Sequence, residues 1–128
     1  MNLSYKKVEK LCSKTEISDL FAENKIVSVY PVKIVWRKTK FNTSIPVKSV
    51  ISVSKRRFKR AVDRNLLKRR LRESFRKNKH SLYQTIQNSN YQVAMMIIYQ
   101  SNEKLPFLEI EQALQKALQK LIKKLENL

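Results

Sequence analysis

Thirteen lysine and arginine side chains lie in the segment from Lys55 to Lys79, whose only acidic residues are Asp63 and Glu73. The net charge of this segment is therefore +11, out of +18 for the whole 128-residue chain. Charges of one sign at this density repel one another and oppose a compact state unless a polyanion neutralises them. Arginine outnumbers lysine here, and arginine grips phosphate through paired N–H donors. The segment therefore predicts binding to a nucleic acid.

The same segment predicts a helix from Ala61 to Lys79. Its apolar residues recur at helical spacing, at Val62, Leu66, Leu67, Leu71 and Phe75. Its cations recur every four residues in a second stripe, at Arg60, Arg64, Lys68, Arg72 and Arg76. One face of such a helix can pack on a sheet while the other presents guanidinium groups.

Few residues are available for catalysis or metal binding. A single cysteine and a single histidine exclude intrachain disulfides and zinc clusters, and the lack of glycine excludes Walker loops and dinucleotide fingerprints. Asp19 and Glu23 share a helix face but have the surroundings of solvated carboxylates, and Asp63 and Glu73 are expected to form local ion pairs. A nuclease site would need carboxylates clustered on a metal. We therefore expect no catalytic residue and no metal site made by the protein alone.

The rest of the chain predicts one α+β domain over residues 1–128, without repeat or linker. Its 42% hydrophobic content with 30% charge is typical of a soluble globular domain. The expected order is a helix (8–24), a possible short strand (26–29), a strand (32–37), a hairpin-type loop (38–46), a strand (47–53), the basic helix, a polar connector (82–90), a strand (91–99) and a final amphipathic helix starting at Pro106. Val32, Ile34 and Trp36 alternate with other residues, which favours core positions. A single Trp on a strand of a basic protein is also a candidate for stacking on an unpaired base.

No segment predicts a membrane or secretory location. The N-terminus lacks the apolar run of a signal peptide. The longest apolar run, residues 93–99, is far shorter than the roughly 20 residues that a membrane helix needs. A cytoplasmic protein without membrane contact is expected.

The basic segment also resembles the signature of the protein subunit of bacterial ribonuclease P. That family has a Val-Ser-Lys strand end followed by an Arg-Asn-Arg motif at the start of a basic helix. Here Ser52-Val53-Ser54-Lys55 precedes the sequence RNLLKRRLRESF, residues 64–75. The resemblance implies a ribosomal-protein-S5-like fold of order αβββαβα, with about four strands, three helices and a left-handed βαβ crossover.

The resemblance implies that the chain assists an RNA catalyst. The holoenzyme is an endoribonuclease in which the ribonuclease P RNA, with bound Mg²⁺, removes the 5′ leader from precursor tRNA. The protein is expected to act as a monomer in a 1:1 complex with that RNA. By position, the residues facing RNA would be Lys55, Arg56, Arg60, Arg64, Asn65, Lys68, Arg69, Arg72 and Arg76. The single-stranded leader would lie in a cleft lined by Ile17, Phe21 and Trp36.

The chain departs from the family pattern at three places. Leu66 replaces the second arginine of the motif, and Arg69 and Arg70 are candidates to compensate for it. Lys59-Arg60 stands where a Gly-Asn is often found, and Ile17 stands where Phe is common.

Two other classes of function are compatible with the charge pattern. A ribosomal or other structural RNA-binding protein would also need a basic surface to neutralise RNA phosphates. A helix-turn-helix DNA-binding protein would need a second short helix just before Ala61, where the sequence has a strand and a charged turn instead.

Overall fold

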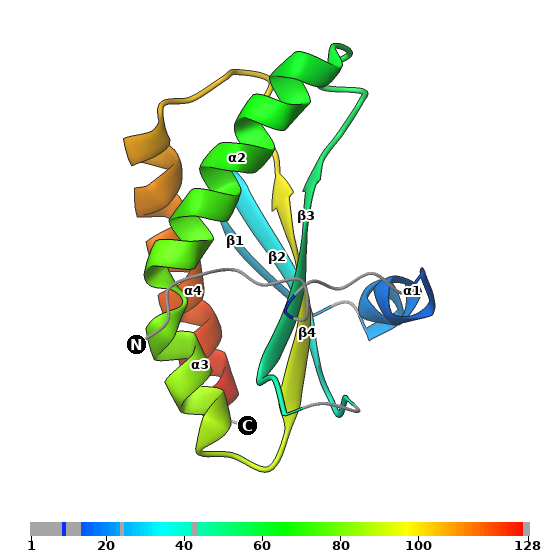
Figure 1. Cartoon of the computed structure of the whole chain (residues 1–128), viewed down its shortest axis with the longest axis vertical. Coiled ribbons are helices and arrows are strands. Elements are labelled where there is room, and N and C mark those ends of the chain that lie inside the picture. The colour runs from blue at the N-terminus through cyan, green and yellow to red at the C-terminus, as the bar shows by residue number, and fades with distance from the viewer. Residues whose placement is uncertain (1–8, 10–13, 24, 42–43, 127–128) are drawn as a thin grey trace.

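The computed structural model describes residue 9 and residues 14–23, 25–41 and 44–126. These form a four-stranded sheet with helices on both faces (Figure 1). The α+β class is confirmed, as is the short first strand. The elements are α1 (Lys14–Glu23), β1 (Lys25–Val29), β2 (Val32–Thr39), β3 (Val47–Val53), α2 (Ala61–Asn78), α3 (His80–Gln87), β4 (Gln92–Tyr99) and α4 (Phe107–Glu126).

The first helix lies within the range that the sequence predicts. It is described from Lys14 to Glu23, and residues 8, 10–13 and 24 of the expected range lie outside the described residues. Its contacts are with β2 and β4, on the face of the sheet opposite to the other helices (Figure 1).

The sheet has the strand order β1-β2-β4-β3. β4 is antiparallel to β2 and parallel to β3, so it lies between them, and the prediction of a hairpin-type loop at 38–46 is wrong. A strand that pairs along both edges and is covered on both faces must be apolar throughout, and β4 has that composition. The β3–α2–α3–β4 connection joins neighbouring parallel strands, as the resemblance implies. The left-handed sense of this crossover stays a prediction.

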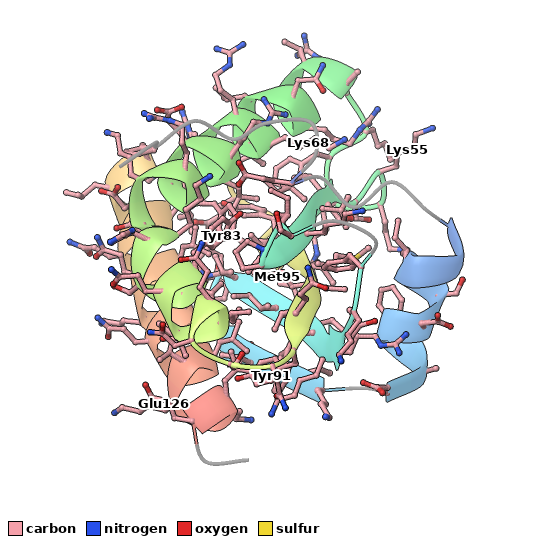
Figure 2. All side chains as sticks on the ribbon, turned by 60° about the horizontal axis from the view of Figure 1, so that its bottom comes forward. Lys55, Lys68, Tyr83, Tyr91, Met95 and Glu126 are labelled. Carbon is pink, nitrogen blue, oxygen red and sulfur yellow. The ribbon has the colours of Figure 1, made fainter. Side chains whose placement is uncertain are left out.

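Side chains of β4 alternate between two apolar clusters. Val93, Met95 and Ile97 join the main core, which also includes side chains of α2, α3 and α4. Ala94 and Met96 face the other way, into a small cluster that Ile17 of α1 and residues of neighbouring strands complete. Figure 2 shows Met95 inside the molecule, between the sheet and the helices. The sheet is therefore a two-sided core rather than a platform with one bare face.

α2 packs on the sheet through a narrow apolar seam. Leu67, Leu71 and Phe75 are fully buried, as the helical spacing predicts. The seam begins later than expected, because Val62 is 60% exposed and Leu66 is only half-buried. The helix therefore buries one side and leaves its first turn at the surface.

The connector predicted at 82–90 is wrong, because residues 80–87 form the helix α3. Leu82 and Ile86 are one helical turn apart and both lie in the main core, while Gln84 between them is exposed. Lys79, between α2 and α3, keeps right-handed helical backbone angles. The described part of the chain thus contains four helices, where the resemblance implies three.

α4 starts directly after Pro106, whose carbonyl accepts the first helical hydrogen bond from Ile110 N at 3.2 Å. Its predicted apolar repeat is buried at Ile110, Ala113, Leu114, Ala117, Leu118, Leu121 and Leu125. No helix in the described part of the chain combines the length and the apolar character of a membrane span.

A buried ion pair joins Glu9 to the junction of α2 and α3. Lys79 Nζ lies 2.6 Å from Glu9 Oε2, and the two side chains are only 5% and 8% exposed. The Tyr83 hydroxyl donates a second hydrogen bond to the same carboxylate oxygen. A buried carboxylate needs such partners because burial otherwise disfavours its charged form.

We expect Lys79→Ala to lower the free energy of unfolding by about 3–5 kcal/mol, because it removes one partner of a buried ion pair. Lys116→Ala removes the same side chain from the exposed face of α4 and should change it by less than about 0.5 kcal/mol. Urea unfolding of both variants tests this. Equal changes in the free energy of unfolding for the two variants would contradict a stabilising role of the Lys79–Glu9 pair.

Candidate nucleic-acid interface

The turn between β3 and α2 is anchored by one aromatic side chain. Phe58 is 7% exposed and its ring lies 6.0 Å from that of Tyr99. Phe58 N donates to Ser54 O at 3.1 Å, and Arg56 N donates to Ser54 Oγ at 3.0 Å. The cations of the turn are all exposed around this anchor, at Lys55, Arg56, Arg57, Lys59 and Arg60. Phe58 had no predicted role, although a lone aromatic residue in a run of cations is the available signal for such an anchor.

The Arg64 side chain forms hydrogen bonds within the protein. Its Nη1 donates to the carbonyl oxygens of Phe58 and Lys59, both at 2.9 Å. These bonds fix the turn against the first turn of α2. Only the remaining N–H groups of Arg64 are left to face a phosphate, so this residue has both a structural role and the predicted place in the interface.

Arg70 and Arg76 also have partners within the protein. Arg70 Nη1 donates to the carbonyl of Leu105, so of the two candidates to replace the motif arginine only Arg69 stays exposed beside Leu66. Arg76 forms an ion pair with Glu73 one helical turn away. The hydrogen bond from Arg76 is the largest cause that holds the pKa of the Glu73 carboxyl below its ordinary value. Burial opposes it, and the charges of Arg76 and Lys77 add smaller lowering effects. The stabilisation is present at neutral pH and is lost as the pH falls through that lowered pKa, and it is small because both side chains are partly exposed.

The other predicted cations have no such partner. Within the described part of the chain, no hydrogen bond or ion pair engages the side chains of Lys55, Arg56, Arg60, Lys68, Arg69 or Arg72. On α2 the exposed ridge runs through Asn65, Arg69 and Arg72. Figure 2 shows Lys55 and Lys68 toward the end of the molecule where β3 leads into α2. The structure therefore brings the turn and the exposed side of α2 together into one basic surface.

A pocket of about 260 Å³ lies beside α1, on the opposite face of the sheet. It is lined by Asp19, Arg37, Thr39, Lys40, Phe41, Lys48 and Ala94. Arg37 Nη1 pairs with Asp19 at 3.1 Å, and Lys48 Nζ lies 4.9 Å from the centre of the Phe41 ring. The pocket thus combines cations with an aromatic ring, and Phe41 is a member that the sequence analysis missed.

The three residues predicted for the leader cleft do not come together. Ile17 packs in the small cluster under α1, and Phe21 is 52% exposed on the same helix. Trp36 is 2% exposed in the main core, so its place in the cleft is wrong. Successive side chains of a strand point to opposite faces, and on β2 it is Val35 and Arg37 that face α1. Of the two interpretations of Trp36, a core residue or a stacking surface for a base, the structure therefore supports the core residue.

Known proteins resemble this chain over most of its length. A family model described as Ribonuclease P matches residues 5–122. Proteins named ribonuclease P protein component from two strains of Porphyromonas gingivalis are 37% identical to it over 112 residues, which are 88% of this chain and 82% of each relative.

Solved structures share the fold. The RNase P protein of Staphylococcus aureus superposes with a TM-score of 0.68 at 20% identity, covering 90% of this chain and 96% of that one. The RNase P protein from Thermotoga maritima gives a TM-score of 0.65 at 22% identity, covering 88% and 96%.

The partners of Arg64 and Arg72 predict different effects of their removal. Arg72→Ala should weaken binding to a bacterial ribonuclease P RNA and reduce the slope of log affinity against log salt concentration by about one. Its Tm should not change. Arg64→Ala should also lower the free energy of unfolding by about 1–3 kcal/mol, because two carbonyls lose a charged donor. Binding titrations at several salt concentrations, together with thermal melts, measure both. Equal Tm values for the two variants would contradict the structural role of Arg64.

Proposed function

The chain belongs to the ribonuclease P protein family, and we propose that its basic turn and the exposed side of α2 bind the RNA subunit of that ribonucleoprotein. As the protein component of ribonuclease P, it is a subunit of a tRNA-processing endoribonuclease and works with ribonuclease P RNA. The observation that carries the proposal is a set of cationic side chains on a helix fixed by its buried seam, for which the described part of the chain offers no hydrogen-bond or ion-pair partner.

A fixed array of cations suits a folded RNA. Each phosphate that a lysine or arginine neutralises releases counterions, which favours binding and makes it depend steeply on salt. A rigid helix offers the array without the ordering cost of a flexible basic tail. The chain would thereby lower the Mg²⁺ concentration at which the RNA adopts its active structure and binds its substrate.

The chain's own acidic groups do not fit a resident Mg²⁺. Mg²⁺ takes oxygen ligands in octahedral geometry. Asp63 pairs with Lys104 at 3.1 Å, and Glu73 pairs with Arg76. The described residues contain no group of three His, Cys, Asp or Glu side chains able to hold a metal. We infer that the magnesium of the holoenzyme is held by RNA and that this chain supplies positive charge.

We further propose that the pocket beside α1 receives the single-stranded 5′ leader of precursor tRNA. Single strands bind where cations track the backbone and aromatic rings stack on bases. Lys40 and Lys48 supply the cations and Phe41 the ring. The pocket lies across the sheet from α2, so one chain could hold the RNA subunit and the leader at once in a 1:1 complex.

Reconstitution tests the first proposal. The wild-type chain should stimulate cleavage of precursor tRNA by a bacterial ribonuclease P RNA at low Mg²⁺. Lys68→Ala/Arg72→Ala should lose most of this stimulation at low Mg²⁺. At high Mg²⁺ its cleavage activity should approach that of the wild type, because the metal replaces the lost charge. Lys116→Ala/Lys120→Ala removes the same charge from the exposed side of α4 and should behave like wild type. Equal activity of the two double variants would contradict an interface on α2.

Leader binding is tested with two aromatic variants. Phe41→Ala should weaken holoenzyme binding of precursor tRNA by about 1–3 kcal/mol, the value of one stacked base, and leave binding of mature tRNA unchanged. Trp36→Phe should affect neither, because Trp36 is in the core and its Nε1 has no hydrogen-bond partner to lose. The measurement is the affinity ratio of precursor to mature tRNA. A loss in Trp36→Phe but not in Phe41→Ala would restore Trp36 to the leader site.

A further inference from the structure

A second aromatic surface lies at the end of the sheet nearest the basic turn. Tyr30, in the turn between β1 and β2, is 67% exposed, more than Phe21, Val62 or Leu108. The register places the start of β2 level with the end of β3, because Val32 and Val53 both pair with Tyr99 of β4. The residues that follow Val53 form the basic turn, so the Tyr30 ring and the cations share one end of the sheet.

Tyr30 is held at its hydroxyl and open around its ring. The hydroxyl donates to Ser101 Oγ at 2.8 Å, and Ser101 is itself 2% exposed. The turn is fixed to the same loop by a hydrogen bond from Gln100 N to Pro31 O at 2.7 Å. A ring that is 67% exposed although its hydroxyl is bonded presents its faces to solvent. It is a preorganised stacking surface and not a freely rotating side chain.

The loop that holds Tyr30 also holds a cation of the basic turn. Arg57 Nη1 donates to Asn102 Oδ1 at 3.0 Å, one residue after Ser101. The loop is stiff, because the Tyr99 hydroxyl donates to Glu103 O at 2.6 Å and accepts from Leu105 N at 3.1 Å. Tyr30 and Arg57 are thus attached to adjacent residues of one rigid loop. Glu103 is the exposed acid of this loop, and the exposed Lys55 and Arg56 beside Arg57 outweigh it.

We propose that Tyr30 and Arg57 form a site for an unpaired nucleotide of the ribonuclease P RNA. The base would stack on the Tyr30 ring and its phosphate would face Arg57. Every base has a π-face, so such a site needs no particular sequence, only a nucleotide outside a helix. The site extends the proposed interface from α2 over the basic turn to the β1–β2 turn at the same end of the sheet, and it rests on that interface.

Stacking and charge have separable signatures in binding measurements. Tyr30→Ala should weaken binding of the full-length chain to ribonuclease P RNA about five- to hundredfold with the salt slope unchanged, because no charge is lost. Arg57→Ala should flatten the slope by about one. Tyr30→Phe keeps the ring and loses only the Ser101 bond, so it should bind nearly as well as wild type. Leu108→Ala, which trims a similarly exposed apolar side chain on α4, is the matched control. Thermal melts check that each variant is folded.

Ultraviolet crosslinking of the wild-type complex locates the contact without mutation. Cleavage after lysine releases residues 26–33, in which Tyr30 is the only aromatic residue, so a nucleotide adduct on this peptide is expected. Wild-type affinity of Tyr30→Ala, or binding lost equally in Tyr30→Phe and Tyr30→Ala, would overturn the site. A Tyr30→Ala defect seen only with precursor tRNA would also overturn it, since it would assign the ring to the substrate. Failure of the wild-type chain to bind the RNA would instead overturn the proposed function.

Discussion

The apolar seam of α2 is the contact on which the rest of this structure depends. Leu67, Leu71 and Phe75 are fully buried against the sheet and α4. Burying three such side chains contributes roughly 5–9 kcal/mol, which opposes the mutual repulsion of the surrounding cations. The seam also sets the rotation of the helix about its axis, and therefore which side chains face outward. A basic segment without it would be a flexible polycation that loses entropy on binding, whereas α2 presents Arg69 and Arg72 already in place.

The arginines of the basic segment divide between two tasks. Arg64 and Arg70 donate to backbone carbonyls of the adjacent turn and of the loop before α4, and so build the frame. Arg69 and Arg72 have no such bonds and are left for the partner. The division follows from helix geometry, in which each residue advances by about 100° around the axis. Arg64 and Arg70 lie three residues to either side of the buried Leu67 and so flank the seam, whereas Arg69 and Arg72 lie on the side opposite to it. The charge of the segment therefore overstates the number of phosphates it can neutralise.

Features set by local spacing were predictable from the sequence, and features set by long-range pairing were not. The basic helix and the central character of β4 follow from residue spacing and apolar content alone. The insertion of β4 between β2 and β3 depends on a crossover of nearly forty residues, which no local pattern encodes. α3 was missed because only Leu82 and Ile86 of its eight residues are buried, and its polar residues are those of a loop. Phe58 was missed because its partner, Tyr99, is distant in sequence.

The placement of Trp36 shows why an aromatic residue in a strand is a weak signal of ligand binding. The alternation that makes Val32, Ile34 and Trp36 recognisable as a strand also directs all three to one face, and helices cover that face. Aromatic rings that stay accessible must then lie where the strand ends or the helical cover stops. Phe41 follows β2 and Tyr30 precedes it, and both have cations nearby. In a sheet covered on both faces, the rings that the sheet itself offers to single-stranded RNA belong to its turns, and the strand residues serve to position those turns.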